Sequence, residues 1–293
     1  MPSLVTICGE SYSGTTMLEL MLGHSPRAFS CGEVAYWYRP VTEAHRRLNC
    51  GCGADPCTAW EPLRNIPAER FHAEVCRRLD VELVTDSSKR LSWVVDANRW
   101  AVASRLDVVN LAIWKSPLAH LHSHWKRGKP LSNALRRYRR YYTRLLRWGA
   151  PVMTVNYHRL TAAPASELAL VCRRIGIDYF PGKECFWNGQ SHLLYGNRRT
   201  QSQVGADAGA IEESVDYPPE FLAAAADVRH HWESSAMRRL CSELESRDVS
   251  RQEVPEDRPA SDRRAVPWWY YPQRFDDAWR ALLGRYRPAK RAG

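Results

Sequence analysis

The sequence predicts an α/β fold in which a parallel β-sheet is flanked by helices. Four short apolar runs have the length of strands and occupy residues 3–8, 81–85, 108–114 and 151–156. Segments long enough to form helices separate these runs, and this alternation is typical of parallel strands joined by helical crossovers. With 293 residues, 44% of them hydrophobic and 25% charged, the chain is long enough to bury a core and too apolar to be disordered.

Helices are expected between and after the strands. Their predicted ranges are residues 15–23, 68–79, 99–106, 117–127, 132–148, 164–175, 219–232 and 234–245. Residues 246–267 carry few apolar side chains and predict a polar linker. We therefore expect one domain over residues 1–245 and an aromatic and basic C-terminal extension over residues 268–293. The Trp268-Trp269-Tyr270-Tyr271 cluster of this extension is expected to dock on the core.

The chain is basic and contains no membrane-spanning pattern. Lysine and arginine number 42 against 32 acidic residues, a net charge of +10 with neutral histidines, so we expect an anionic partner: nucleic acid, a membrane surface or a phosphorylated small molecule. No stretch approaches the roughly 20 apolar residues of a membrane span. The first strand-like run leaves no room for a removable signal, and nine cysteines fit free thiols better than a disulfide framework. These features predict a cytoplasmic protein.

The first strand leads into a loop that has the spacing of a phosphate-binding motif. The loop reads Gly9-Glu10-Ser11-Tyr12-Ser13-Gly14-Thr15-Thr16 and precedes an apolar helix. Backbone N–H groups at such a strand-to-helix junction point at an anion. Thr15 stands where nucleoside triphosphatases carry the lysine that reaches the β- and γ-phosphates, which argues against phosphoryl transfer. A small hydroxyl there suits one terminal phosphate, and a tight turn without a ligand is the alternative.

The Ser13-Gly14-Thr15-Thr16-x-Leu segment resembles the 5′-phosphosulfate loop of sulfotransferases that use 3′-phosphoadenosine 5′-phosphosulfate (PAPS). The resemblance implies a P-loop-NTPase-like sulfotransferase fold, and it implies that the loop binds the donor. The implied loop residues are Ser11, Tyr12, Ser13, Gly14, Thr15 and Thr16. The family usually has arginine or lysine immediately before S-G-T-T, where this chain has Tyr12. The cation that neutralises the departing phosphate must therefore come from elsewhere.

Later segments resemble the same family in the same order, and the resemblance extends over residues 1–245. Lys115 and Ser123 are eight residues apart, the spacing at which the family holds the 3′-phosphate with arginine and serine. Lysine can meet a phosphate as a point charge but lacks the bidentate fork of arginine. Residues 156–160 resemble the family's Y-E-D-L segment.

Residues 191–199 resemble the family's H-x-x-x-G-N-R segment, which closes over the nucleotide. This likeness implies that Asn197, Arg198 and Arg199 help to bind the donor, with one of the two arginines adding a charged contact.

Sulfuryl transfer needs a base for the acceptor and positive charge on the leaving phosphate. Residues 30–34 resemble the family's G-E element, which makes Glu33 the candidate base, with His24, His45 and Asp86 as competitors. A surface or structural glutamate is the alternative reading of Glu33. Lys89 follows the second strand, at the sheet edge where such chemistry is placed, and could supply the missing cation.

Two further features have more than one interpretation. Cys50, Cys52 and Cys57, with Cys31 and His45 close in sequence, are compatible with a metal site, a disulfide or packed thiols, and we expect packed thiols beside the acceptor site. Residues 125–148 carry nine cations and no acid on an amphipathic helical pattern. This helix is either a solvated face on a core helix or a surface that attracts the donor, a membrane or nucleic acid.

The sequence therefore predicts a PAPS-dependent sulfotransferase that acts on a hydroxyl of a small-molecule, sugar or lipid-like acceptor. The expected product is adenosine 3′,5′-bisphosphate, and no metal is required. Nucleic acid is not an expected partner, and a weak contact with an anionic membrane surface is an additional possibility. The alternatives are a degenerate P-loop kinase or nucleotidase, and a non-catalytic basic protein that binds membranes or nucleic acid.

Overall fold

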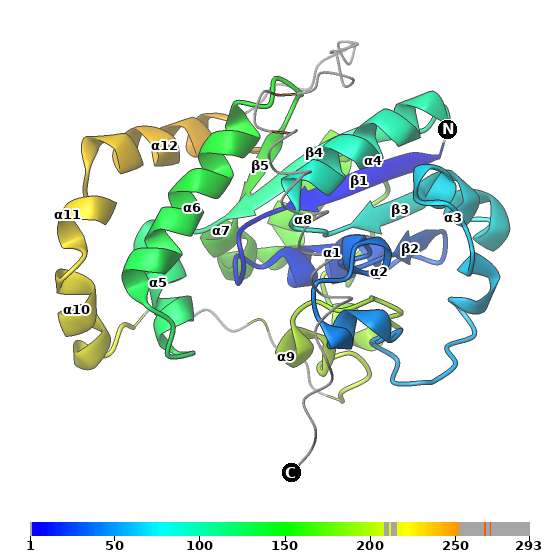
Figure 1. The fold of residues 1–293 in the computed structure, drawn as a ribbon, viewed down its shortest axis with the longest axis horizontal. Coiled ribbons are helices and arrows are strands. Elements are labelled where there is room, and N and C mark those ends of the chain that lie inside the picture. Colours follow the sequence, from blue (N-terminus) through cyan, green and yellow to red (C-terminus); the bar gives the residue numbers. More distant parts are fainter. Residues whose placement is uncertain (1, 208–210, 212–215, 252–266, 268–269, 271–293) are drawn as a thin grey trace.

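Five parallel strands form the predicted sheet, in the spatial order β2-β3-β1-β4-β5 (Figure 1). The computed structural model describes residues 2–207, 211, 216–251, 267 and 270. The strands are β1 (Ser3–Cys8), β2 (Ala28–Ser30), β3 (Leu83–Asp86), β4 (Asp107–Trp114) and β5 (Met153–Asn156). Four of them lie where the sequence predicts strands, which confirms the α/β class. The three-residue β2 is too short to give a periodicity signal, and it forms by pairing with β3.

Helices cover both faces of the sheet (Figure 1). They are α1 (Thr15–Gly23), α2 (Ala35–Tyr38), α3 (Phe71–Leu79), α4 (Leu91–Ala103), α5 (Pro117–Trp125), α6 (Leu131–Leu146), α7 (Tyr157–Ala162), α8 (Pro164–Ile175), α9 (Arg198–Gln201), α10 (Pro219–Ala226), α11 (Arg229–Trp232) and α12 (Ser235–Ser246). Short 3-10 turns η1 to η4 occupy Glu43–Arg46, Glu61–Leu63, Ala68–Arg70 and Phe186–Asn188.

Successive residues of β1 point to opposite faces of the sheet and into different core clusters. Val5 and Ile7 pack with α1 and α8 on one face, whereas Leu4 and Cys8 pack against the helices of the other face. Because β1 is covered on both sides and paired on both edges, it carries apolar side chains on both faces rather than on one.

Two helix predictions differ from the structure for identifiable reasons. Helix α4 begins at Leu91, eight residues before the predicted start, because residues 91–98 are all buried and therefore show no amphipathic alternation. The helix predicted over residues 219–232 is divided into α10 and α11.

The start of the predicted polar linker is part of the folded domain. Asp248 and Val249 are fully buried, and Val249 donates its backbone N–H to the carbonyl of Thr154 in β5 at 3.0 Å. The domain therefore extends beyond residue 245 to at least residue 251. Residues 252–266, 268, 269 and 271–293 lie outside the described residues, and with them most of the predicted linker and extension.

Tyr270 is the described residue of the aromatic cluster, and it packs into the core. Its side chain is 5% exposed within the cluster that contains α4 and α6, and its hydroxyl donates to the carboxylate of Asp96. Among the described residues, the helices include none with the length and apolar character needed to cross a bilayer.

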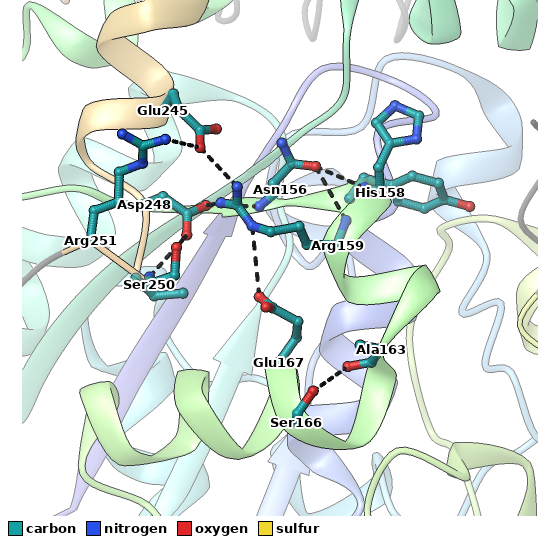
Figure 2. Close-up of polar contacts among 12 residues, drawn as sticks. Asn156, His158, Arg159, Ala163, Ser166, Glu167, Glu245, Asp248, Ser250 and Arg251 are labelled. Carbon is teal, nitrogen blue, oxygen red and sulfur yellow. Dashed lines mark hydrogen bonds and ion pairs between the residues drawn. The ribbon is translucent and has the colours of Figure 1, made fainter.

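Arg159 in α7 joins this helix to the end of α12 and to the buried Asp248 that follows it (Figure 2). Its guanidinium lies 2.5 Å from Asp248 and 2.8 Å from Glu245, with Glu167 at 4.0 Å. Asp248 also accepts a hydrogen bond from the backbone N–H of Asn156 at 3.1 Å. A carboxylate with no solvent exposure needs such partners, because burying a charge without compensation is costly.

We expect Arg159→Ala to destabilise the fold by about 2–3 kcal/mol, because it leaves the Asp248 carboxylate buried without its cation. This loss of stability is smaller than the ~3–5 kcal/mol expected when a fully buried ion pair is broken, because a third of the Arg159 side chain is exposed. Urea denaturation measures the effect. The matched control is Arg229→Ala, which removes the exposed pair with Glu233 and should leave the midpoint unchanged. Equal shifts in both variants would contradict the role of Arg159.

Candidate functional site

A cleft of about 860 Å³ opens where β1 and β4 end. The order β3-β1-β4 places the connections of β1 and β4 on opposite sides of the sheet, and such switch points are where open α/β sheets bind ligands. The cleft is lined by the loop after β1, by Lys115 after β4, and by residues of α5, α6 and the segment around Gly196. The cationic lining residues are Lys89, Arg90, Lys115, Lys126, Arg127, Arg137, Arg140, Arg144 and Arg199. This charge makes the cleft a site for an anion of several charges.

The loop after β1 packs tightly against neighbouring backbone and side chains at two of its glycines. Gly14 has φ +106°, and a Cβ there would lie 2.6 Å from the ring of Tyr157. A Cβ on Gly9 would lie 2.3 Å from Ser13 Oγ and 3.0 Å from the carbonyl of Ile113. Both positions therefore require glycine, and Gly14 leads into the first turn of α1, whose N–H groups have no acceptor within the helix.

Tyrosines of α6 satisfy the polar backbone at the ends of the central strands. Tyr141 accepts the N–H of Gly9 at 3.0 Å, and Tyr142 donates to the carbonyl of Ile113 at 2.8 Å. Tyr138 donates to the carbonyl of Lys115 at 3.0 Å. These contacts leave the rim of the loop open toward the cleft.

Lys115 and Ser123 come together as the sequence predicts. Lys115 Nζ lies 3.3 Å from Ser123 Oγ and 4.1 Å from the centre of the Tyr157 ring. Burial, together with the charges of Lys126 and Arg127, lowers the pKa of Lys115 to about 7. A bound anion beside this ammonium would favour its charged form and raise that pKa again.

The segment after His192 crosses to the loop after β1 and the start of α1. Asn197 donates its backbone N–H to Thr16 Oγ1 at 3.1 Å, and its side chain caps α9 by accepting from the N–H of Arg199. Arg199 lines the cleft whereas Arg198 does not, which selects between the two predicted arginines. Of the other predicted loop residues, Ser13 is buried beneath the loop and is absent from the lining.

Glu33 and Lys89 both line the cleft and contact each other as an ion pair. The Glu33 side chain is 10% exposed and that of Lys89 17% exposed. Although burial opposes the charged form of Lys89, the Glu33 carboxylate raises the lysine's pKa above its usual range. The candidate base and the candidate cation are therefore one unit, in which each charge partly neutralises the other.

The competing bases lie outside the cleft lining. His24 bonds to the carbonyl of Lys183, and His45 stacks on Tyr36. Asp86 is buried and accepts hydrogen bonds from Trp93 at 2.7 Å and from Ser88 N–H at 2.8 Å. Instead, the cleft-lining histidines of the described chain are His122 and His158.

Sequence reasoning singled out the basic helix but not its residues as part of this site. Arg137, Arg140 and Arg144 of α6 line the cleft, and their i, i+3, i+7 spacing places them on one helical face. That spacing is the sequence signal from which a shared position of the three arginines could have been predicted. Arg137 also contacts the buried carboxylate of Glu10 at 2.6 Å, and Glu10 gave no signal in the sequence.

The cysteine cluster in the structure has different members from the group that the sequence suggests. All nine cysteines are free thiols, and Cys50, Cys52 and Cys57 gather around His192. Cys31 and His45, which are close in sequence, do not belong to this group.

Known structures share this fold. A sulfotransferase domain from the curacin biosynthetic pathway matches with a TM-score of 0.55 and 16% identity, over 87% of this chain and 99% of that domain. A sulfotransferase domain from the Synechococcus PCC 7002 olefin synthase matches with a TM-score of 0.49 and 17% identity, over 98% and 96%. No protein-family model and no curated protein match the sequence. The first similarity shows that this chain has a sulfotransferase-type fold.

Gly14→Val should abolish binding of a phosphate-bearing nucleotide at the loop. The side chain would meet the Tyr157 ring at a backbone angle that valine rarely adopts, and it would displace the loop that faces the anion. Calorimetric titration with adenosine 3′,5′-bisphosphate measures the loss. Gly149→Val is the matched control, since Gly149 also has positive φ but its Cβ would meet nothing within 4 Å. Unchanged affinity in Gly14→Val would remove the loop from the site.

Proposed function

We propose that the protein is a PAPS-dependent sulfotransferase that acts on a hydroxyl of a small-molecule, sugar or lipid-like acceptor. The observation that carries the proposal is the cleft itself: a phosphate loop without the triphosphatase lysine, a Lys115–Ser123 pair and a buried carboxylate line one cavity. The fold shared with the curacin-pathway sulfotransferase domain supports it. We expect this enzyme to work in the cytoplasm.

In the proposed complex the loop and the first turn of α1 bind the 5′-phosphosulfate through backbone N–H groups and the hydroxyls of Thr15 and Thr16. Lys115 and Ser123 bind the 3′-phosphate, since an ammonium and a hydroxyl 3.3 Å apart can meet neighbouring phosphate oxygens. Arg199 adds charge from the segment that Asn197 ties to Thr16.

Transfer forms a bond between the acceptor oxygen and sulfur while the bond from sulfur to the 5′-phosphate oxygen breaks. The hydroxyl proton passes to a carboxylate oxygen of Glu33, and the electron pair leaves with adenosine 3′,5′-bisphosphate. Lys89 orients Glu33 through their ion pair. The step needs no metal, because the cations of the cleft stabilise the charge that develops on the leaving phosphate.

Arg127 is a further source of charge near Tyr12. Its guanidinium lies 4.1 Å from the centre of the Tyr12 ring and lines the cleft. The charge that the family places at the position of Tyr12 is therefore supplied by a residue stacked on that tyrosine as well as by Lys89.

Lys115→Ala should lose roughly 1.5–3 kcal/mol of binding free energy for adenosine 3′,5′-bisphosphate and almost none for AMP, which lacks the 3′-phosphate. Calorimetric titration of both nucleotides measures the difference. Equal losses for the two ligands would exclude Lys115 from the 3′-phosphate site.

The same site should be pH-dependent. Below pH 7 the ammonium of free Lys115 is already charged, given its pKa of about 7. Above pH 7 binding must take up a proton, so bisphosphate affinity falls by up to about tenfold per pH unit until the pKa of the complex is reached. Lys115→Arg keeps its charge and should flatten the profile between pH 7 and 9. A flat profile in the wild type would contradict the role of Lys115.

Glu33→Gln should lower turnover by about 10² or more while donor affinity stays nearly unchanged, because the amide keeps the shape but cannot accept the proton. Mass spectrometry for a sulfate-sized addition to candidate alcohols provides the assay. Lys89→Ala should also lower turnover, since it removes a cation and leaves Glu33 without its partner. Full activity of Glu33→Gln would transfer the role of base to another residue.

Two further measurements separate the alternatives. Mg²⁺-dependent phosphoryl transfer would favour the kinase interpretation. Salt-sensitive binding to anionic vesicles or DNA, without nucleotide binding, would favour the non-catalytic interpretation.

A further inference from the structure

Three thiols and one imidazole converge on a single point beside residues 193–199, the segment that carries Asn197 and Arg199. Cys52 Sγ lies 3.3 Å from Cys50 Sγ and 3.5 Å from Cys57 Sγ. His192 Nδ1 lies 3.3 Å from Cys57 Sγ and 3.7 Å from Cys50 Sγ. All four atoms lie within 4.8 Å of one another, although His192 follows Cys57 by 135 residues.

These separations match the edges of a tetrahedral zinc site. Zinc binds thiolate sulfur at about 2.3 Å and imidazole nitrogen at about 2.0–2.1 Å, which places two sulfurs about 3.8 Å apart and a sulfur and a nitrogen about 3.6 Å apart. Four of the six separations in this cluster fall between 3.3 and 3.7 Å. A single disulfide would use only two of the four groups and would leave a third thiol and the imidazole with no shared role.

The surroundings fit a closed metal site. Cys50 and Cys57 are buried while Cys52 is exposed, so an ion could enter from the surface. The indole of Trp60 donates to the carbonyl of His192 at 2.7 Å and holds the histidine toward the thiols.

We propose that Cys50, Cys52, Cys57 and His192 bind one Zn²⁺ ion in a structural Cys₃His site. Four protein ligands complete the tetrahedron and leave no position for a substrate, so the ion has no part in the transfer step. Zinc binding displaces the thiol protons to solvent and joins the loop before Trp60 to the segment after His192.

The location gives the ion a positioning role in the cleft. Next to His192, the carbonyl of Leu193 accepts the N–H of Gly51 at 2.8 Å, and the carbonyl of Leu194 accepts the N–H of Glu33 at 2.8 Å. Asn197 then reaches Thr16. Zinc therefore stabilises the segment that carries Arg199 and positions the backbone of Glu33. This consequence rests on the proposed function, whereas the metal site itself does not.

Metal analysis of the full-length chain, expressed without a metal-binding tag, tests the site. We expect about one zinc per chain by inductively coupled plasma mass spectrometry. Cys50→Ser, Cys57→Ser and His192→Ala should lose it, while His192→Cys should retain it as a four-thiolate site. Cys185→Ser removes a thiol outside the cluster and should keep the full zinc content.

The wild-type protein gives a second measurement that does not depend on the folding of variants. Cobalt-substituted protein should show the intense visible absorption of tetrahedral Co²⁺ with thiolate charge-transfer bands, and chelators should lower the melting temperature as zinc is released. A Cys50–Cys52 or Cys52–Cys57 disulfide found by mass mapping would overturn the proposal, as would a protein purified without metal whose nine cysteines are all reduced. Zinc content is measured independently of activity, so a failed sulfuryl-transfer assay would leave this result standing.

Discussion

The cleft depends on how polar backbone is satisfied at the ends of β1 and β4. An anion site needs N–H groups that face outward, yet the neighbouring backbone is buried and must be hydrogen-bonded. Helix α6 resolves this conflict, since its tyrosine hydroxyls bond the N–H of Gly9 and the carbonyls of Ile113 and Lys115. The carboxyl ends of β1 and β4 are thereby both sealed by side chains from one helix, and the loop rim stays available.

The same helix explains the charge of the cleft. Tyr138, Tyr142 and the leucines of α6 pack into the core, whereas Arg137, Arg140 and Arg144 lie on the face that lines the cavity. Burial opposes the charged form of Lys115, and the neighbouring cleft cations Lys126 and Arg127 repel its ammonium. A multiply charged anion would relieve this repulsion. Three arginines of this acid-free helix therefore belong to the lining of the cleft.

Backbone contacts of one extended segment complete the cavity. Leu194 bonds the main chain at both Cys31 and Glu33, and Gly196, with φ +84°, passes close to Thr16. A Cβ on Gly32 would lie 2.2 Å from the carbonyl of Leu194, so this glycine is required for the close approach. The candidate base and the start of α1 are consequently held by a segment more than 150 residues away in sequence. The thiol and imidazole cluster lies at the start of that segment, where a metal ion would fix it.

Local sequence pattern predicted the parallel α/β class and the glycine-bearing loop after β1, because strand runs and glycine positions are short-range features. The pairing of Lys115 with Ser123 was instead expected from the resemblance to PAPS-dependent sulfotransferases. Tertiary structure decided the rest. Helix α4 lacked a signal because it is buried all round, and β2 exists only through its partner strand. The ion pair of Glu33 with Lys89 and the choice of His192 over His45 at the cysteines join residues far apart in sequence. Such contacts depend on how the elements pack, and no local periodicity encodes them.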